Sequence, residues 1–256
     1  GGPALHAPLE RARLDWAARD GDWVCAGQQV CSIAAQSRAL LSAERAALNF
    51  LQTLSATATQ TARYVSAIEG ASPNPRGCVI LDTRKTLPGL RQAQKYAVRM
   101  GGGTNQRLAL WDGILIKENH IVAAGGIPQA LRAARELLLG SASGAGEAAD
   151  ATEEHGSPGA ISLQIEVETI EQLDEALRAG ARSVLLDNFS PEGLSAAVAH
   201  AWAFAEQQGE PPALLEASGG LSLEQLRAVA QTGVDRISVG RLTKDITATD
   251  YSLRVV

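Results

Sequence analysis

Charged and glycine-containing segments follow a series of short apolar runs in this chain. They carry Arg84, Lys85, Lys117, Glu168, Asp187, Ser218, Gly219, Gly220 and Gly240. Cationic side chains bind anions, and a charge that directly follows a buried run cannot swing freely into bulk water. The two carboxylates have the chemistry to hold Mg²⁺ or ribose hydroxyls, or to pair with neighbouring cations. Backbone N–H groups of glycine turns at a helix start bind phosphate, although Gly240 is equally compatible with a plain tight turn.

A second basic segment follows three consecutive glycines at residues 101–103. These glycines predict a tight turn that delivers Gln106 and Arg107 into a loop, where the forked guanidinium is a natural carboxylate ligand. Upstream, three cations recur at four-residue steps, which predicts a solvated helix face that adds to the field attracting anions: Arg91, Lys95 and Arg99.

The charge distribution predicts a small polyanionic ligand. Residues 83–111 contain six basic and no acidic residues in a chain of net charge −5, which argues against general nucleic-acid binding.

The absence of GxSxG, Walker and HExxH motifs excludes serine hydrolases, P-loop NTPases and zincins. His120 has no second histidine at ligand spacing, so we interpret it as structural. Three cysteines without CxxC spacing suggest no zinc site, and we expect them to be buried: Cys25, Cys31 and Cys78.

The elements that position these residues alternate between strands and helices. Short β-rich runs lie at 78–83, 113–117, 161–168, 183–188, 214–218 and 236–240, each followed by a helical stretch. This alternation predicts a parallel sheet and favours a closed or nearly closed α/β barrel, with a doubly wound sheet as the alternative. In such barrels the active site lies at the C-terminal ends of the strands, so the segments above should meet at one rim.

The N-terminal part follows a different pattern. Residues 15–33 are short and turn-rich, which predicts a small β-structure, and 40–68 have the periodicity of a long amphipathic helix. Arg45 lies on the flank of its apolar face, either solvated or directed across an interface. Residues 140–160 are rich in Gly, Ala, Ser and Glu, and predict a flexible surface insertion without a catalytic role.

The ends and the hydropathy of the chain give two further expectations. The chain opens on Gly1 and its single methionine is Met100, so we expect N-terminal sequence to be missing. No charged-then-apolar leader opens it, and its apolar runs stay short of the ~18 residues that a membrane helix needs. We therefore predict a soluble, cytoplasmic protein with no membrane partner.

Taken together, these motifs resemble a known family. DTRKTLPGLRQAQKYAVRMGGGTNQRLALWDGILIKENHI (82–121) is similar to the signature of quinolinate phosphoribosyltransferase, also called nicotinate-nucleotide pyrophosphorylase (carboxylating). ERAALNFLQTLSATAT, IEVET, LLDNF, LEASGGLS and GVDRISVG match the same family in the same order. The resemblance implies a small N-terminal α/β sandwich domain (1–72) and an open α/β barrel domain (73–256). It also implies a homodimer and the conversion of quinolinate and phosphoribosyl pyrophosphate (PRPP) into nicotinate mononucleotide, pyrophosphate and carbon dioxide in NAD biosynthesis, with Mg²⁺ and no organic cofactor.

The resemblance also implies a role for each matching residue. The quinolinate ligands are Arg84, Gln106, Arg107, Lys117 and Arg45, the last from the neighbouring subunit. The phosphoribosyl half belongs to Lys85, Glu168, Asp187, Ser218, Gly219, Gly220 and Gly240. The catalytic groups are Lys85, Lys117, Glu168 and Asp187, and the Mg²⁺ ligands are Glu168 and Asp187.

One departure from the family pattern keeps alternatives open. The family's glycine loop usually ends in His-Arg, and here the pair is Gln106 and Arg107. Glutamine donates a hydrogen bond but supplies neither positive charge nor a titratable proton. The alternatives are a paralogue of the same fold that uses another anionic acceptor, and a catalytically silent structural homologue.

Overall fold

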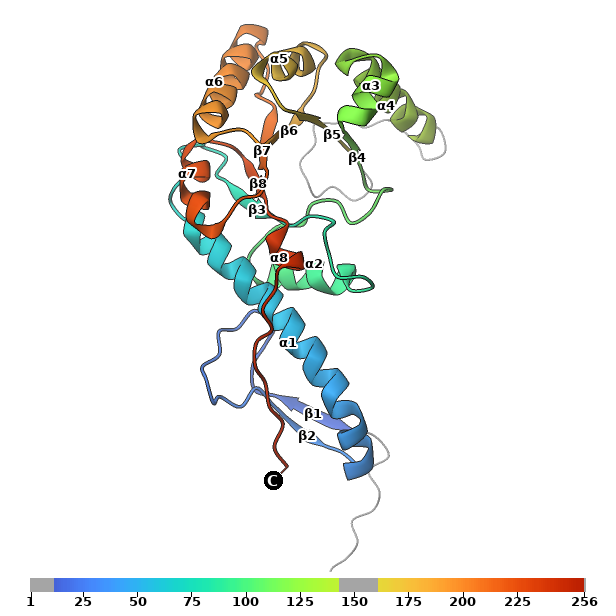
Figure 1. Ribbon diagram of the computed structural model, residues 1–256, viewed down its shortest axis with the longest axis vertical. Helices are drawn as coiled ribbons and strands as arrows, with labels where there is room; N and C mark the ends of the chain where they lie inside the picture. Colours follow the sequence, from blue (N-terminus) through green and yellow to red (C-terminus); the bar gives the residue numbers. More distant parts are fainter. Residues whose placement is uncertain (1–11, 143–160, 256) are drawn as a thin grey trace, which may run out of the picture.

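The computed structural model describes residues 12–142 and 161–255, with a curved parallel sheet surrounded by helices (Figure 1). The strands of this sheet are β3 (Val79–Leu81), β4 (Gly113–Ile116), β5 (Ser162–Val167), β6 (Ser183–Asp187), β7 (Leu214–Ser218) and β8 (Arg236–Ser238). Their order is β3-β8-β7-β6-β5-β4, and each neighbouring pair is parallel. Because β3 and β4 form the two edges, the barrel is open between them, as expected.

The strand order decides between the two predicted architectures. From β4 to β8 each strand lies beside its predecessor. All crossovers therefore proceed in one direction, and their right-handedness places every helix on the outer side of the sheet. A doubly wound sheet would instead reverse its strand order at a switch point.

The helices that follow the strands form the outer layer. Its helices are α2 (Arg91–Met100), α3 (Glu118–Ala124), α4 (Ile127–Ala142), α5 (Ile170–Arg178), α6 (Pro191–Gln208), α7 (Leu226–Gln231) and α8 (Arg241–Lys244), with a 3₁₀ turn at Leu223–Gln225. The Thr169 side chain accepts a hydrogen bond from the backbone N–H of Gln172, and the Ser190 side chain accepts one from Gly193. These N-caps start α5 and α6 close to the ends of β5 and β6.

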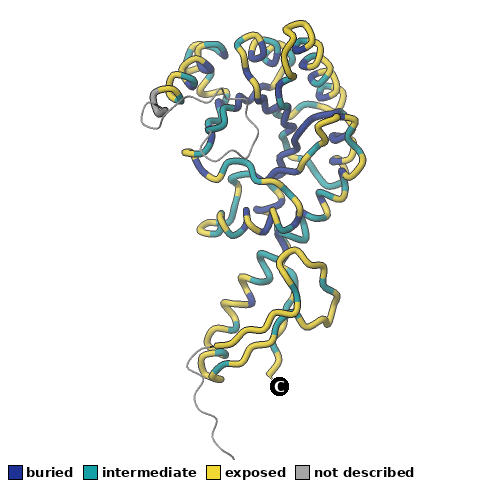
Figure 2. Tube along the Cα trace, turned by 180° about the vertical axis from the view of Figure 1, so that it is seen from behind, coloured by how far each residue is buried: buried dark blue, intermediate teal, exposed yellow. Residues whose placement is uncertain are grey.

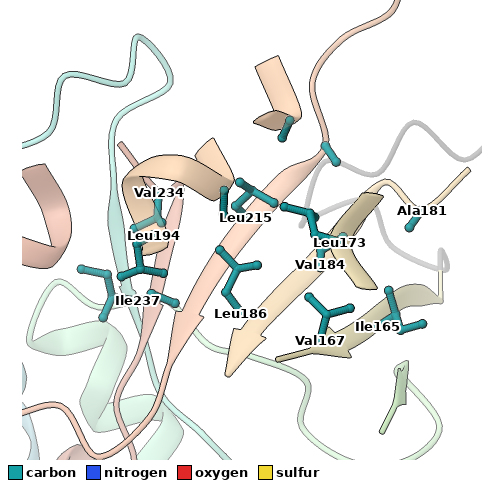
Figure 3. Packing of buried hydrophobic residues seen from close by; sticks show 14 of the residues in the cluster. Ile165, Val167, Leu173, Ala181, Val184, Leu186, Leu194, Leu215, Val234 and Ile237 are labelled. Atoms are coloured by element: carbon teal, nitrogen blue, oxygen red, sulfur yellow. The ribbon is translucent and has the colours of Figure 1, made fainter. Parts of the chain in front are cut away.

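The two faces of the sheet differ in chemistry because successive strand residues point to opposite sides. The outer face packs beneath the helices as an apolar core that includes Ile165, Val167, Val184, Leu186, Leu215 and Ile237 (Figure 3). The alternate residues are buried and polar: Gln164, Glu166, Glu216, Arg236 and Ser238. Gln164 on β5 donates to Glu216 on β7 although β6 lies between them. This reach shows that the polar set lines the concave interior of the barrel.

The N-terminal segment forms a separate extension. β1 (Arg13–Trp16) and β2 (Cys31–Ala34) are antiparallel, and α1 (Ser37–Ile68) continues from them. The C-terminal half of α1 packs on α2 and the barrel, whereas its N-terminal half projects away with the hairpin (Figures 1 and 2). Residues 246–255 run back along α1, where Thr249 N–H donates to Gln52 O at 3.2 Å and Tyr251 OH donates to Ser55 Oγ at 3.2 Å.

The triple glycine brings α2 close to α1. A Cβ added at Gly101 would lie 2.7 Å from Thr61 Cβ, and one added at Gly103 would lie 2.7 Å from Thr61 Cγ2. Gly102 has φ +82°, a conformation that favours glycine. The predicted tight turn is therefore present, and it also forms a close contact between the two helices.

The structure also bears on the expectations for the cysteines and for the insertion at 140–160. The expected burial of the cysteines is wrong for Cys25, which is exposed in the turn-rich connection between β1 and β2, while Cys31 and Cys78 are half-buried. Of the insertion predicted at 140–160, residues 140–142 complete α4, and the remainder lies outside the described residues. In the described part of the chain, no helix combines the length and apolarity required to cross a membrane.

Candidate active site

The end of β3 and the start of α8 bring together Lys85 and Gly240, both predicted as phosphate ligands. A Cβ at Gly240 would lie 3.2 Å from Lys85 Cδ, so the lysine side chain lies directly against this glycine. Thr83 Oγ1 accepts a hydrogen bond from Lys85 N–H, and Thr243 Oγ1 donates to Lys85 O at 2.8 Å. The two threonines fix the backbone from which the exposed lysine projects.

The ends of β6 and β7 meet in the same way. Asp187 and Ser218 are register partners, and Asn188 N–H donates to Ser218 O at 3.0 Å. Gly219 has φ +139°, a conformation that favours glycine, and a Cβ there would lie 3.0 Å from Asn188 Oδ1. Asn188 itself has φ 58°. Exposed Gly220 follows next in the chain.

The two predicted carboxylates leave adjacent strands. Val167 pairs with Leu186 in the parallel register of β5 and β6, so Glu168 and Asp187 follow side by side. Glu168 is exposed and Asp187 is half-buried. Among residues 12–142 and 161–255, no group of three or more His, Cys, Asp or Glu side chains is arranged to hold a metal ion. The protein therefore offers two oxygen-bearing side chains here, not a complete metal cage.

Lys117 has a partner that the sequence analysis missed. Its Nζ lies 2.6 Å from Glu166 Oε2, and the side chains are 45% and 9% exposed. Glu166 belongs to the inward-facing set of β5, and Lys117 directly follows β4. The signal in the sequence was the alternation of Gln164 and Glu166 with apolar residues, which places both polar side chains on the same strand face.

A second buried carboxylate, Glu216, also escaped the sequence analysis. Its Oε1 accepts from Gln106 Nε2 at 3.1 Å, and its Oε2 accepts from Gln164 Nε2 at 2.9 Å. Burial raises the pKa of Glu216, against the opposing effect of hydrogen bonds from Gln164 and Ser238. Gln106 thus enters the barrel interior, but its amide nitrogen is already engaged by the protein.

Arg107 points into a small hollow at the open edge of the barrel. The hollow is lined by Gln106, Arg107, Ile114, Leu115, Ser162 and Gln164. Arg107 Nη1 donates to Gly113 O at 3.0 Å, while its buried Nε has no hydrogen-bond partner among the described residues. Burial, together with the charge of Arg84, lowers the pKa of Arg107. The positive charge of Arg84 thus disfavours a second positive charge at Arg107, which an anion bound nearby would offset.

The predicted solvated row on α2 is wrong at its centre. Lys95 is fully buried, and its Nζ donates to Asp82 Oδ1 at 2.5 Å and to Gln106 O at 2.7 Å. Burial lowers the pKa of Lys95 and raises the pKa of Asp82, and their mutual attraction opposes both shifts. The lysine turns inward because Asp82, directly after β3, provides a buried partner.

Two further residues, Arg45 and His120, complete the set. Arg45 is exposed on the projecting half of α1, sixteen residues before Thr61, a distance of about 24 Å along a helix. His120 Nδ1 accepts from Lys117 N–H at 3.0 Å and caps α3, in agreement with the structural role predicted for it.

An open parallel barrel that gathers cations, carboxylates and glycine turns at the C-terminal ends of its strands defines a barrel enzyme with an anion-binding mouth. The N-terminal domain model of quinolinate phosphoribosyl transferase matches residues 3–55, and the C-terminal domain model matches residues 57–143 and 138–254. The chain belongs to the quinolinate phosphoribosyltransferase family, which confirms the resemblance of its motifs.

Individual relatives agree with this assignment. The chain is 41% identical to the nicotinate-nucleotide pyrophosphorylase (carboxylating) of Mycobacterium leprae, over 94% of this chain and 74% of that protein. It is 34% identical to the human protein of the same name, over 95% and 73% of the two chains. Among solved structures, NadC from Streptococcus pyogenes superposes with a TM-score of 0.78 at 33% identity, over 95% of this chain and 75% of that one.

Proposed function

We propose that this protein transfers the phosphoribosyl group of PRPP to quinolinate with decarboxylation, and so supplies nicotinate mononucleotide for NAD biosynthesis. The observation that carries the proposal is Arg107, whose buried Nε has no hydrogen-bond partner among the described residues, at the mouth of a barrel of this family that also carries Arg84. Such a pair suits a planar dicarboxylate, and neighbouring Lys85 and Gly240 suit a phosphate.

The acceptor half uses the two arginines and the interior wall. A carboxylate placed between Arg84 and Arg107 relieves their repulsion. Its oxygen would also satisfy the buried Nε of Arg107, which has no partner in the described part of the chain. Lys117 follows β4 and is paired with Glu166, and it adds a third cation to the site. Quinolinate, with two adjacent carboxylates of which one lies next to the ring nitrogen, matches this arrangement.

The donor half uses the opposite wall of the mouth. The ring nitrogen forms a bond to ribose C1 as the C1–O bond breaks, and the bonding electrons leave with pyrophosphate. Positive charge develops at C1, where the carboxylates Glu168, Asp187 and Glu166 have the sign that stabilises it. Lys85 and the backbone near Gly219 and Gly240 are suited to bind phosphate oxygens.

Decarboxylation needs no organic cofactor in this scheme. In the pyridinium product the bond from C2 to its carboxylate breaks, and the electron pair stays on C2 beside the positive ring nitrogen. A proton then replaces the released carbon dioxide. The ring is its own electron sink, so the task of the protein is to bind and orient the acceptor.

We further propose that Mg²⁺ accompanies PRPP and is held by Glu168 and Asp187. Glu168 and Asp187 follow adjacent strands and would provide only two ligands to the ion. The other positions would be open to phosphate oxygens and waters, which Mg²⁺ prefers. When bound, the ion supplies neutralisation of the charge on the departing pyrophosphate.

We also propose a homodimer in which Arg45 reaches the neighbouring subunit's mouth. The extension that carries Arg45 exposes large apolar side chains, which marks an interaction surface: Trp16, Trp23, Leu41 and Phe50. Arg45 is itself exposed, in the half of α1 that projects away from the barrel (Figure 1). A cytoplasmic location belongs to the same proposal, because the three cysteines are free thiols.

One observation favours a second candidate, a transferase of the same fold that uses another anionic acceptor. Gln106 stands where the family usually has histidine, and Glu216 engages its amide nitrogen. The site therefore lacks a titratable donor at this position. An acceptor with one carboxylate would need fewer cationic contacts than quinolinate.

The test is incubation of the purified protein with PRPP, Mg²⁺ and either quinolinate or nicotinate, followed by chromatography of the nucleotide product. We expect nicotinate mononucleotide and stoichiometric carbon dioxide from quinolinate only. Turnover of nicotinate without turnover of quinolinate would contradict the proposal and support the second candidate. Heat-inactivated protein is the control for non-enzymatic loss of PRPP.

A further inference from the structure

The cations of α2 contact both segments that carry the arginines of the acceptor site. They form a cation row at four-residue spacing: Arg91, Lys95 and Arg99. At one end, Arg91 Nη2 donates to Arg84 O at 3.2 Å and its Nε donates to Thr86 Oγ1 at 3.2 Å. At the other end, Arg99 Nη1 donates to Asn105 Oδ1 at 2.7 Å. The row therefore spans the turn after β3 and the loop that leads into Arg107.

The centre of the row holds the loop most firmly. Lys95 and Asp82 are both fully buried and paired at 2.5 Å. Lys95 Nζ also donates to Gln106 O, and Asp82 Oδ1 accepts from Gln106 N–H at 2.9 Å. Asp82 Oδ2 accepts from Asn105 Nδ2 at 2.6 Å. The pair thus holds Gln106 by both its N–H and its carbonyl, directly before Arg107.

A buried ion pair is weak evidence for stability, because well-packed apolar side chains often stabilise a core as much. What this pair adds is a set of hydrogen bonds that link the segment after β3 to the loop before Arg107. Arg84 and Arg107 carry like charges on two different segments, and these segments need a fixed framework to stay close. Asp82 stands two residues before Arg84 on the first segment, and its hydrogen bonds reach the second.

We propose that Asp82 and Lys95 are positioning residues, which hold the Arg84 turn and the Arg107 loop at the spacing that a dicarboxylate acceptor requires. This inference rests on the proposed function for the identity of the acceptor. Neither side chain touches the substrate, since both are fully buried. Arg91 supports the same framework from the first segment.

The test uses the double variant Asp82→Asn/Lys95→Met, which removes both charges and leaves no unpaired ion. We expect the quinolinate Kd measured by calorimetry to rise about 10- to 100-fold, the cost of a small misplacement of binding groups, with little change in the PRPP KM. The half-buried Arg91 gives a second, milder variant, Arg91→Met, with the same direction of effect. Arg76→Met is the matched control, because Arg76 pairs with Asp235 at 2.8 Å near the N-terminal ends of the strands and should lower the Tm without changing the quinolinate Kd.

Hydrogen exchange gives a readout that does not depend on the acceptor. We expect the backbone amides of residues 103–107 to exchange faster in the double variant and unchanged in Arg76→Met. If both test variants bind quinolinate as tightly as the control and these amides stay protected, the inference is overturned. If the wild type fails to bind quinolinate while the amides lose protection, the proposed substrate is wrong and the positioning role stands.

Discussion

At the scale of single residues, the structure separates two glutamates that the sequence places two positions apart. Glu166 points into the barrel and pairs with Lys117, whereas Glu168 is exposed beyond the end of β5. The sequence analysis selected Glu168 because it ends the strand, but inward orientation favours Glu166 as well. The charge of a buried carboxylate acts at lower effective dielectric and is therefore less screened at a given distance.

Glu166 in β5 and Glu168 directly after it provide a matched comparison. We expect Glu166→Gln to lower kcat about 100-fold, as loss of a preorganised electrostatic group does. Glu168→Gln should have the smaller effect, because water screens its charge. Steady-state kinetics of both variants with quinolinate and PRPP check this, and a larger loss in Glu168→Gln would contradict it.

Glu216 predicts a pH dependence of stability. Because burial raises its pKa, the folded state holds this proton more tightly than the unfolded state. The contribution of Glu216 to the free energy of unfolding therefore falls as pH rises above its ordinary pKa, through the interval up to the raised value. Glu216→Gln removes this loss. We expect the urea midpoint of Glu216→Gln minus that of the wild type to increase as the pH is raised from 4 to 7.

The control for this measurement is Glu206→Gln, a substitution of an exposed glutamate on α6. Its midpoint relative to wild type should stay constant over the same pH range. A constant difference for Glu216→Gln as well would show that this carboxyl titrates alike in the folded and unfolded states.

At the scale of elements, the contact between α1 and α2 depends on two glycines. Gly101 and Gly103 lie against Thr61 with no space for a side chain. The same turn carries the chain from α2 into the loop of Gln106 and Arg107. Helix packing and site geometry are therefore coupled through three consecutive residues.

This coupling predicts that Gly101→Ala destabilises the protein by about 1–3 kcal/mol, the usual cost of overpacking a close contact. Gly220→Ala is the control, because nothing lies within 4 Å of a Cβ at that position. Chemical denaturation of both variants measures the difference. Equal stability of the two would show that α1 and α2 separate without cost.

At the scale of the whole molecule, the extension and the C-terminal tail belong together. Residues 246–255 leave the barrel after α8 and follow α1 toward the hairpin of β1 and β2 (Figure 1). Hydrogen bonds to Gln52 and Ser55 fasten them there. The C-terminal segment is thus attached to the middle of α1, seven to ten residues after Arg45.

The proposed shared site predicts complementation between inactive variants. Arg45→Ala and Arg107→Ala should each abolish most activity, because each removes one acceptor ligand from every site. Mixed dimers place both substitutions in one site and leave the other intact. Equal mixing should therefore restore about a quarter of wild-type activity if the subunits exchange freely. Absence of recovery after verified exchange, shown by mass spectrometry of labelled subunits, would contradict a shared site.

The sequence alone predicted the alternation of strands and helices and the segments that form the rim, whereas the strand order decided the barrel. Apolar runs and helical periodicity report burial and element type directly, because each depends on local side-chain pattern. For this reason the six strands, the long helix α1 and the glycine turn appear where they were predicted. The family motifs added the reaction, and they imply the roles proposed for the rim residues.

Only the tertiary structure decided which charged side chains meet. Lys95 has the spacing of a solvated helix residue, yet it is buried because Asp82, thirteen residues earlier, ends a neighbouring strand beside it. Gln106 reaches Glu216 across more than a hundred residues of sequence. Contacts of this kind depend on the curvature of the sheet and the packing of α2, which no local pattern encodes.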